Sequence, residues 1–381
     1  MRILILATDI YTRGGIARHT YTFASALADL LGPENVHLVA LLGGGDPSDL
    51  HPRFRVLGPI TERLTGAAKV QFVMKALALA RNKYDLVVCS HLSLALVAAA
   101  IRFVYRTPFW VVCYGLEAWG PLPLLRRLAL SQSDLLLPIS RFTADKLSEV
   151  HKIPQRTMFI LHTAIPNDLE RLLTAPGGAR ASEASVLNRE RILLSVGSLG
   201  RDLAYKGFET VIRALPVALK RVPNLRYLIV GEGDDRPRLE RLTGELQLQR
   251  YVTFAGSVSD EQLAKYYRSC DVFVLPSKAT AKNGSWEGEG FGRVYVEAAL
   301  AGKPVVGSRT GGAAEAVLDR ETGFLVDPLS VDEVAHAAIM LLSDAELAAS
   351  MGAAGRKWAM ENFTQQALRR RLAELLKLHA L

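Results

Sequence analysis

The chain has 381 residues, of which 49% are hydrophobic, and carries a net charge of +8 at pH 7. This length exceeds what one hydrophobic core usually serves, so we expect two α/β domains of about 150 to 200 residues each. The longest apolar run, 92–101, is far shorter than the roughly 20 residues that cross a bilayer, and the run at 3–7 is too brief for a secretory signal. We therefore expect a cytoplasmic protein with no membrane-spanning segment.

The positive charge is concentrated in the first half of the chain. Lys and Arg outnumber Asp and Glu by 20 to 13 before residue 181, and by only 26 to 25 after it. Many of these cations lie among apolar residues at 53–83 and 102–127, a mixture that suits an anionic membrane surface or a lipid-phosphate acceptor; solvated helix faces are the alternative. We expect salt-sensitive peripheral association with the inner face of the cell membrane. No nucleic-acid partner is expected, because no compact basic run or known binding module is present.

Several kinds of site are missing from the sequence. Cys89, Cys113 and Cys270 are scattered without metal or redox spacing, and we expect them to be buried thiols. Neither the dinucleotide-binding pattern of three spaced glycines nor a P-loop ending is present. No Asp-x-Asp pair or His cluster lies near the motifs described below, so we expect no metal and no cofactor.

In chain order, strands and helices alternate through the first half. We expect an all-apolar strand at 2–7, a helix near 17–31, a strand at 37–41, a helix near 70–80 and a strand at 85–90. This alternation predicts a parallel, doubly wound sheet.

A second series of the same kind follows a Gly-, Ala- and Ser-rich segment at 174–185, which has the composition of a linker. Its strands and helices are expected in alternation at 191–197, 208–219, 225–231, 236–246, 252–256, 260–270, 272–277, 292–302 and 304–307. We expect two Rossmann-like domains at 1–175 and 190–355, with the amphipathic helical stretch 356–381 packing back on the first. Ligands bind at the carboxyl ends of such strands, which predicts a site in a cleft between the domains.

The richest candidate site lies between a strand that ends at Pro276 and a helix expected to begin about Phe291. Glycines before this helix let backbone amides approach a phosphate or sugar oxygen, and the helix dipole favours negative charge there. Glu289 lies just before the helix and Glu297 eight positions later, and such carboxylates can accept hydrogen bonds from sugar and ribose hydroxyls. The alternative is an Arg293–Glu297 pair at helical spacing, with Glu289 in solvent.

Two further loops between a strand and a helix carry candidate residues. Arg201 and Lys206 could stabilise the charge that develops on the distal phosphate of a departing nucleoside diphosphate without a metal; a solvated loop is the alternative. Gly14 and Gly15 follow the first strand, where they would permit close backbone approach to a phosphate or sugar. A tight turn would need them equally.

Together, EGFGRVYVE at 289–297, TGGAAEAV at 310–317, ETGFLVDP at 321–328, the Lys206 loop and the early glycine pair resemble glycosyltransferase family four, of the GT-B fold. The resemblance covers most of the chain and is strongest over 191–327. It implies a retaining transferase, acting on a nucleotide-diphosphate sugar, whose second domain binds the donor and whose first domain lies on the acceptor side. The site residues that it implies are the catalytic Arg201, Lys206 and Glu289, and the donor-binding Gly14, Gly15, Val258, Phe291, Gly292 and Glu297.

Two positions depart from the family pattern. Tyr114 stands where members often have His, before Gly115 and Glu117. Tyrosine can bond a sugar hydroxyl but has no imidazole to protonate at neutral pH, so Tyr114 and Glu117 are candidate acceptor or sugar contacts only. Ser198 occupies a position where relatives commonly carry Arg, and Arg201 is expected to take over that phosphate contact.

The segments 286–292 and 114–120 resemble family members that build bacterial surface polysaccharides on lipid-diphosphate carriers, several of which use GDP-mannose. We expect transfer of a hexose from GDP-mannose to a glycolipid, lipid-linked or polysaccharide-precursor acceptor, with UDP-glucose or another UDP-sugar as the alternative donor. Among enzymes, a sugar-nucleotide epimerase or phosphorylase of similar architecture is the alternative. The alternative that is not an enzyme is a non-catalytic, membrane-associated partner subunit, which Tyr114 and the basic first half suggest.

Overall fold

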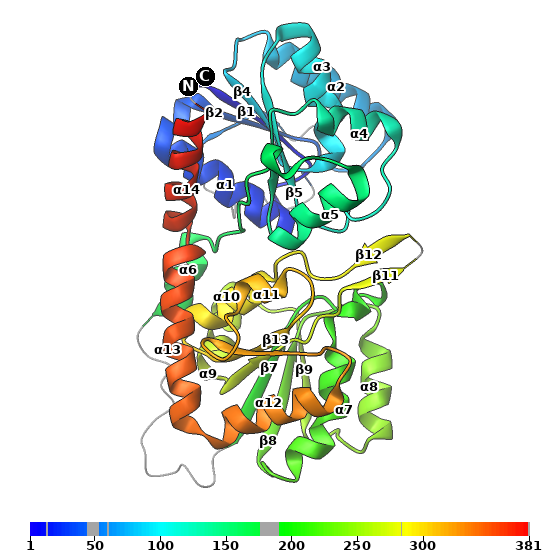
Figure 1. Cartoon of the computed structure of the whole chain (residues 1–381), viewed down its shortest axis with the longest axis vertical. Coiled ribbons are helices and arrows are strands. Elements are labelled where there is room, and N and C mark those ends of the chain that lie inside the picture. Colours follow the sequence, from blue (N-terminus) through cyan, green and yellow to red (C-terminus); the bar gives the residue numbers. More distant parts are fainter. Residues whose placement is uncertain (13, 44–52, 59–60, 176–189, 283, 380–381) are drawn as a thin grey trace. The chain divides into compact units, whose positions relative to one another are not determined.

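The computed structural model describes residues 1–12, 14–43, 53–58, 61–175, 190–282 and 284–379. The chain divides into two compact units, which are labelled by element in Figure 1. The first consists mainly of Met1–Pro166 and Gln365–Leu381, and the second mainly of Asn167–Lys282 and Trp286–Thr364. Most of the expected linker, 174–185, lies outside the described residues.

The first unit is built on a parallel sheet. Among the described residues it has six strands in the order β3-β2-β1-β4-β5-β6. They are β1 (Ile3–Ala7), β2 (Val36–Ala40), β3 (Arg55–Val56), β4 (Leu86–Cys89), β5 (Phe109–Cys113) and β6 (Leu135–Pro138). Every residue of β1, β2, β4, β5 and β6 is buried, which is why these strands appear in the sequence as apolar runs rather than alternating patterns.

Helices cover both faces of this sheet. They are α1 (Gly15–Leu31), α2 (Gly66–Ala80), α3 (Ala95–Tyr105), α4 (Leu124–Ser131), α5 (Arg141–His151) and α14 (Gln365–Leu378). The crossovers β1-α1-β2 and β4-α3-β5 run in opposite directions along the sheet, so with the usual right-handed connection α1 and α3 cover opposite faces. Accordingly, α1 packs against α14, while α3 packs against both α2 and α4 (Figure 1).

The second unit repeats the same strand order, β14-β13-β10-β7-β8-β9. Its strands are β7 (Arg191–Val196), β8 (Leu225–Val230), β9 (Val252–Gly256), β10 (Val272–Val274), β13 (Val305–Ser308) and β14 (Gly323–Val326). Its helices are α6 (Asn167–Thr174), α7 (Phe208–Leu219), α8 (Arg236–Glu245), α9 (Asp260–Ser269), α10 (Arg293–Leu300), α11 (Ala313–Ala316), α12 (Val331–Ser343) and α13 (Ala345–Asn362). All the strand pairings of both sheets are parallel.

This topology gives each unit one switch point, where the chain stops adding strands on one side and starts on the other. It lies between β1 and β4 in the first unit and between β7 and β10 in the second. In open parallel sheets ligands bind outside the carboxyl ends of the strands at this point. The predicted doubly wound α/β architecture of two Rossmann-like units is therefore confirmed.

The individual elements differ from the predictions in a few places. The polar segment after β10, expected to be a long loop, contains the paired strands β11 (Thr280–Lys282) and β12 (Ser285–Glu287). The stretch 356–381, expected to be one helix, is divided at buried Phe363, and α14 but not the end of α13 belongs to the first unit. The domain bounds 1–175 and 190–355 stay a prediction.

Cys89, Cys113 and Cys270 are buried free thiols, as predicted. Among the described residues, no single helix has both the length and the apolar composition to cross a membrane. The adjacent helices α12 and α13 meet those criteria only as a pair, across a bend of 101°.

Candidate active site

Two of the predicted catalytic side chains meet at the switch point of the second unit. Lys206 ends a short 3-10 helix (Arg201–Lys206) that follows β7, and Glu289 lies in the segment that follows β10. Lys206 Nζ donates a hydrogen bond to Glu289 Oε2 at 2.9 Å, and the side chains are only 13% and 19% exposed. Burial by itself lowers the pKa of Lys206, but the charge of Glu289 and this hydrogen bond outweigh it and raise that pKa. Lys206 is therefore a cation at neutral pH.

Close backbone packing fixes the position of Lys206. The next residue, Gly207, has a φ of 82°, and an added Cβ there would lie 2.2 Å from the carbonyl oxygen of Pro276. The backbone N–H of Lys278 also donates to the carbonyl oxygen of Tyr205 at 2.6 Å. A glycine at 207 is thus required for the Lys206 loop to lie directly against the segment that leaves β10.

A glycine turn after β13 fixes the position of Glu289, also through close backbone packing. The backbone N–H of Gly312 donates to the carbonyl oxygen of Glu289 at 2.9 Å. A Cβ on Gly312 would lie 2.0 Å from the carbonyl oxygen of Gly290. The TGG sequence at 310–312 therefore lets a third strand end contact the segment that carries Glu289.

Helix α10 begins two residues later than predicted, because Gly292 takes the left-handed N-cap position with a φ of 84°. The backbone of Phe291 and Gly292 thus lies at the amino end of the helix, while the Phe291 ring is buried 5.1 Å from the ring of Phe363. Backbone amides in this position are suited to an anionic or polar ligand.

Glu297 lies inside α10 and is buried. Tyr267 donates its hydroxyl to Glu297 Oε2 at 2.9 Å, and Arg293 contacts Oε1 at 3.3 Å. Burial, followed by the charge of Glu297, raises the pKa of Tyr267 well above its ordinary value, so its hydroxyl stays a donor. The Arg293–Glu297 pair is thus present, whereas Glu289 is paired with Lys206 rather than left in solvent. Tyr267 was not identified from the sequence, because 30 residues separate it from its partner.

The other predicted residues of the second unit are less closely connected to this pair. The Arg201 side chain is exposed, and its backbone N–H donates to Asp234 Oδ1 at 2.8 Å. Val258 is half-buried in the turn between β9 and α9. Within the described part of the chain, no hydrogen bond or ion pair joins Arg201 or Val258 to Lys206 or Glu289.

In the first unit, Gly14 is the N-cap of α1 and Gly15 is the first residue of that helix. Gly14 has a φ of −68°, and a Cβ on Gly15 would meet no atom within 4 Å. A tight turn therefore does not require glycine at either position in this structure. Open space beside the amino end of α1 agrees with close approach of a ligand to the backbone.

Tyr114 and Glu117 follow β5. Glu117 accepts backbone hydrogen bonds from Tyr114 at 2.6 Å and Gly115 at 3.0 Å, and so shapes its own loop. The buried Tyr114 ring contacts two imidazoles, with centroids 5.5 Å from His19 and 6.2 Å from His91. Neither histidine was identified from the sequence. His91 comes two residues after β4, and His19 lies in the helix that follows β1, the neighbouring strand at the switch point.

The tautomer of His91 follows from its contacts. The backbone N–H of Ser93 donates to His91 Nδ1 at 3.1 Å, so the neutral ring carries its proton on Nε2. Burial lowers the pKa of His91, with a smaller opposing effect from Glu117 and a further lowering by Arg126. His91 is thus neutral at pH 7, and the imidazole absent from position 114 is present beside it.

Among the described residues, no group of three or more His, Cys, Asp or Glu side chains is placed to hold a metal ion. The chemistry available at the site comes from a buried cation, a carboxylate that can accept hydrogen bonds, and amides at a helix start. Such a set can bind a diphosphate and a sugar.

Comparison with known proteins agrees with this arrangement. Residues 180–358 match the family described as Glycosyl transferases group 1, and residues 13–169 match Glycosyltransferase Family 4. The fold is shared with the crystal structure of Anabaena HepE in complex with UDP, at a TM-score of 0.78 and 21% identity over 99% of this chain and 100% of that one. The two units therefore form a glycosyltransferase of the GT-B fold.

Curated relatives identify the family. The chain is 35% identical to the GDP-mannose-dependent alpha-(1-6)-phosphatidylinositol monomannoside mannosyltransferase of Mycolicibacterium smegmatis, over 74% of this chain and 72% of the relative. It is 32% identical to the protein of the same name from Mycobacterium tuberculosis, over 74% of this chain and 73% of that relative. The chain belongs to glycosyltransferase family four.

Proposed function

We propose that this protein is a retaining, metal-independent transferase that moves mannose from GDP-mannose to a lipid-linked acceptor. The observation that carries the transfer chemistry is the Lys206–Glu289 pair at the switch point of the second unit. GDP-mannose is favoured over other donors because the relatives with 35% and 32% identity are GDP-mannose-dependent. A UDP-sugar is the second candidate, since the structural neighbour HepE binds UDP.

In this proposal the second unit holds the donor. Lys206 and the amides of Phe291 and Gly292 bind the diphosphate, Arg201 supplies a second cation, and Glu289 exchanges part of its contact with Lys206 for a hydroxyl of the donor sugar. A carboxylate oxygen can accept two hydrogen bonds, so Glu297 can still bind a ribose hydroxyl in addition to its internal partners.

The transfer step breaks the bond between the anomeric carbon and the distal phosphate oxygen. The electron pair stays on that oxygen, where the charge of Lys206 stabilises it without reorganisation. The acceptor hydroxyl then attacks from the face that the phosphate leaves, and the departing phosphate oxygen takes its proton, so the anomeric configuration is retained. The first unit contributes the backbone at Gly14 and Gly15 to donor binding, and Tyr114 and Glu117 to contacts with the acceptor or the sugar.

The test of this function is transfer from GDP-mannose or UDP-glucose to phosphatidylinositol monomannoside after exhaustive EDTA treatment, with the new linkage determined by NMR. We expect mannose transfer from GDP-mannose with an α linkage, at the same rate with and without EDTA. Preferred use of UDP-glucose would change the donor, and an inverted linkage would exclude the retaining mechanism. Loss of turnover in EDTA that magnesium or manganese restores would exclude metal independence.

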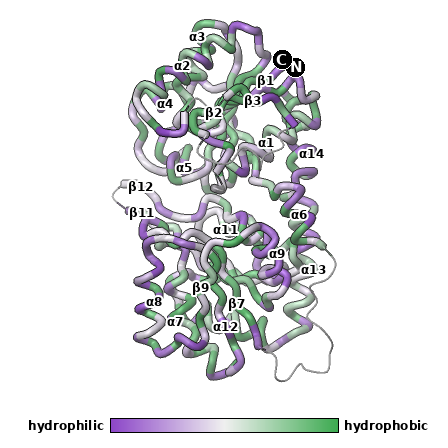
Figure 2. Tube along the Cα trace, turned by 180° about the vertical axis from the view of Figure 1, so that it is seen from behind, coloured by the Kyte–Doolittle hydropathy of each residue, from purple (hydrophilic) through white to green (hydrophobic). Residues whose placement is uncertain are grey.

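The first unit also offers a surface for a membrane. Helices α2, α3 and α4 carry eight of the fifteen large hydrophobic side chains that are exposed among the described residues. They are Val70, Met74, Leu96, Phe103, Val104, Leu124, Leu125 and Leu128. These helices lie side by side on one face of the sheet, and α2 and α3 are mostly green in the hydropathy view of Figure 2. We call their outward side the α2–α4 face.

Cations border these apolar groups. Lys69, Lys75, Arg106 and Arg127 are exposed on or next to the same helices, and Phe103 is 88% exposed. Apolar side chains between cations suit an anionic bilayer, in which the apolar groups insert while the cations meet lipid phosphates. This supports peripheral attachment to the inner face of the cell membrane, where a lipid-linked acceptor is located.

We expect the protein to co-sediment with phosphatidylglycerol vesicles but not with phosphatidylcholine vesicles at low salt. Charge reversal of Lys69, Lys75, Arg106 and Arg127 should weaken binding by about fivefold per residue that contacts lipid, because each contributes roughly 1 kcal/mol. Phe103→Ser and Leu125→Ser should reduce the part of the binding that survives high salt, whereas Leu329→Ser in the second unit should not. Equal binding to both lipids, or binding to neither, would mean that the α2–α4 face is an ordinary solvated surface.

A further inference from the structure

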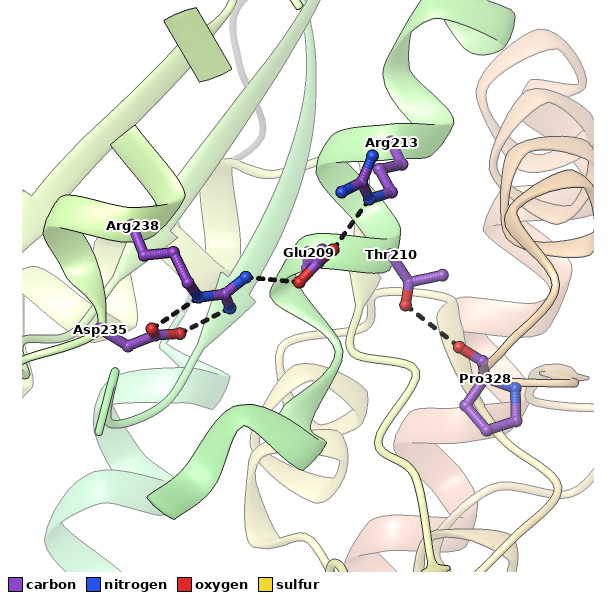
Figure 3. Close-up of polar contacts among 6 residues, drawn as sticks. All are labelled: Glu209, Thr210, Arg213, Asp235, Arg238 and Pro328. Atoms are coloured by element: carbon purple, nitrogen blue, oxygen red, sulfur yellow. Dashed lines mark hydrogen bonds and ion pairs between the residues drawn. The ribbon is translucent and has the colours of Figure 1, made fainter. Parts of the chain in front are cut away.

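A network of charged side chains connects the first turns of α7 and α8 (Figure 3). Arg238 forms a two-pronged contact with Asp235, from Nε to Oδ1 at 2.7 Å and from Nη2 to Oδ2 at 2.8 Å. Its third nitrogen, Nη1, donates to Glu209 Oε2 at 2.5 Å. Arg213 donates to the other oxygen of Glu209 at 2.9 Å. Arg238 thus bridges a nearly buried carboxylate at the start of α8 and a carboxylate in the first turn of α7.

The network is firmly held at each end. The Asp235 side chain is only 6% exposed. Burial would raise the pKa of Glu209, but the hydrogen bonds from Arg238 and Arg213 outweigh it, so that pKa lies below its ordinary value and Glu209 is ionised at neutral pH. The neighbouring Thr210 donates its buried hydroxyl to the carbonyl oxygen of Pro328 at 3.1 Å, which fixes another side of the same helix turn.

The same segment before α8 also contacts the beginning of the loop that carries Lys206. The backbone N–H of Asp235 donates to the carbonyl oxygen of Leu199 at 2.8 Å, and Asp234 Oδ1 accepts the backbone N–H of Arg201 at 2.8 Å. A Cβ on Gly233 would lie 2.2 Å from the carbonyl carbon of Leu199, so the two loops are in direct backbone contact. Glu209, which Arg238 binds, comes three residues after Lys206. The segment before α8 therefore holds the Lys206 loop at its beginning, and Arg238 in the first turn of α8 holds it just beyond its end.

We infer that Arg238 is a positioning residue for glycosyl transfer, which fixes Lys206 through Glu209 and through the Asp235 loop. The inference rests on the proposed role of Lys206 at the departing phosphate. Stabilisation of a developing charge depends on a cation that is held in place before the reaction, so a small displacement of Lys206 lowers the rate without removing the cation. A purely structural role predicts instead that any loss of activity follows a loss of stability, because removing Arg238 leaves the nearly buried Asp235 carboxylate without its counterion.

The first test measures the loop itself and needs no substrate. Arg238→Met keeps most of the length of the side chain but removes the guanidinium. We expect amide hydrogen exchange in the segment 198–208 to be faster by about threefold or more, because the contacts that restrain this loop are weakened. Arg226→Met is the matched control, since Arg226 pairs with Glu190 at 2.9 Å at the opposite end of β8, away from this loop. Unchanged exchange in the segment 198–208 of Arg238→Met would overturn the inference.

The second test is a double-mutant cycle on turnover. We expect Arg238→Met to lower kcat by about tenfold with a smaller change in KM, and Glu209→Gln to have a similar but weaker effect. Arg238→Lys should recover only part of the loss, because lysine cannot form the two-pronged contact. In a Lys206→Ala background, Arg238→Met should lower kcat by less than about twofold, because its effect requires the lysine.

A further tenfold loss in the Lys206→Ala background would show that Arg238 acts independently of Lys206, and would overturn the inference. Melting temperatures of all variants identify any loss caused by unfolding. If the parent protein transfers no sugar, the proposed function is contradicted. The positioning of the Lys206 loop by Arg238 is still decided, because the hydrogen-exchange experiment needs no turnover.

Discussion

Replacement of Lys206 by alanine is expected to lower kcat by about a hundredfold to a thousandfold, the usual cost of one preorganised electrostatic contact in a transition state. Lys206 is held 2.9 Å from Glu289 in a largely buried position, and that carboxylate keeps it charged. The cation is thus in place before the donor reacts. In the proposed mechanism its effect falls mainly on kcat, because the charge on the leaving phosphate increases only as the glycosidic bond breaks.

Stability must be measured alongside this variant, because Lys206→Ala leaves the partly buried Glu289 without its counterion. The double variant Lys206→Met with Glu289→Gln removes both charges, so its melting temperature shows how much of any loss of stability comes from the uncompensated charge of Glu289. Lys220→Ala, at the exposed carboxyl end of α7, is the matched control and should retain parental turnover. A folded Lys206→Ala variant with near-parental kcat would mean that the lysine is only a structural partner of Glu289.

The proximity of Lys206 and Glu289 could be anticipated from the sequence because both follow apolar strands of a parallel sheet. The carboxyl ends of such strands lie along one edge, and β7 and β10 are neighbours. The strands themselves were recognisable because burial on both faces makes them continuous apolar runs. The start of α10 was placed two residues early because the left-handed conformation of Gly292 is not evident from periodicity.

Contacts between side chains far apart in the chain could not be anticipated in this way. Tyr267 reaches Glu297 from α9, and Arg238 reaches Glu209 from α8, and neither spacing corresponds to a helical or strand repeat. His91 is not part of the family pattern, which concerns position 114. Its position two residues after β4, at the switch point of the first unit, is the physical signal available in the sequence.

Replacement of Glu289 by glutamine is expected to lower kcat/KM by about a hundredfold or more, because the proposal places this carboxylate on a hydroxyl of the donor sugar. The variant should also change the pH dependence. In the parent, Glu289 raises the pKa of Lys206 against the opposing effect of burial. Without the carboxylate charge, burial lowers that pKa, so Lys206 loses its proton at a lower pH than in the parent. The alkaline limb of the pH–rate profile should therefore move toward neutrality in Glu289→Gln.

Glu287→Gln provides the control within the same segment. Glu287 lies two residues away and pairs with Lys282 at 3.1 Å, where its side chain is 37% exposed. Removing its charge should change neither kcat/KM nor the alkaline limb, because an exposed pair is screened by solvent. A folded Glu289→Gln variant with parental kcat/KM and an unmoved alkaline limb would exclude Glu289 both as a donor contact and as the group that keeps Lys206 charged. The diphosphate would then have to be stabilised by Arg201 and the amides at the start of α10.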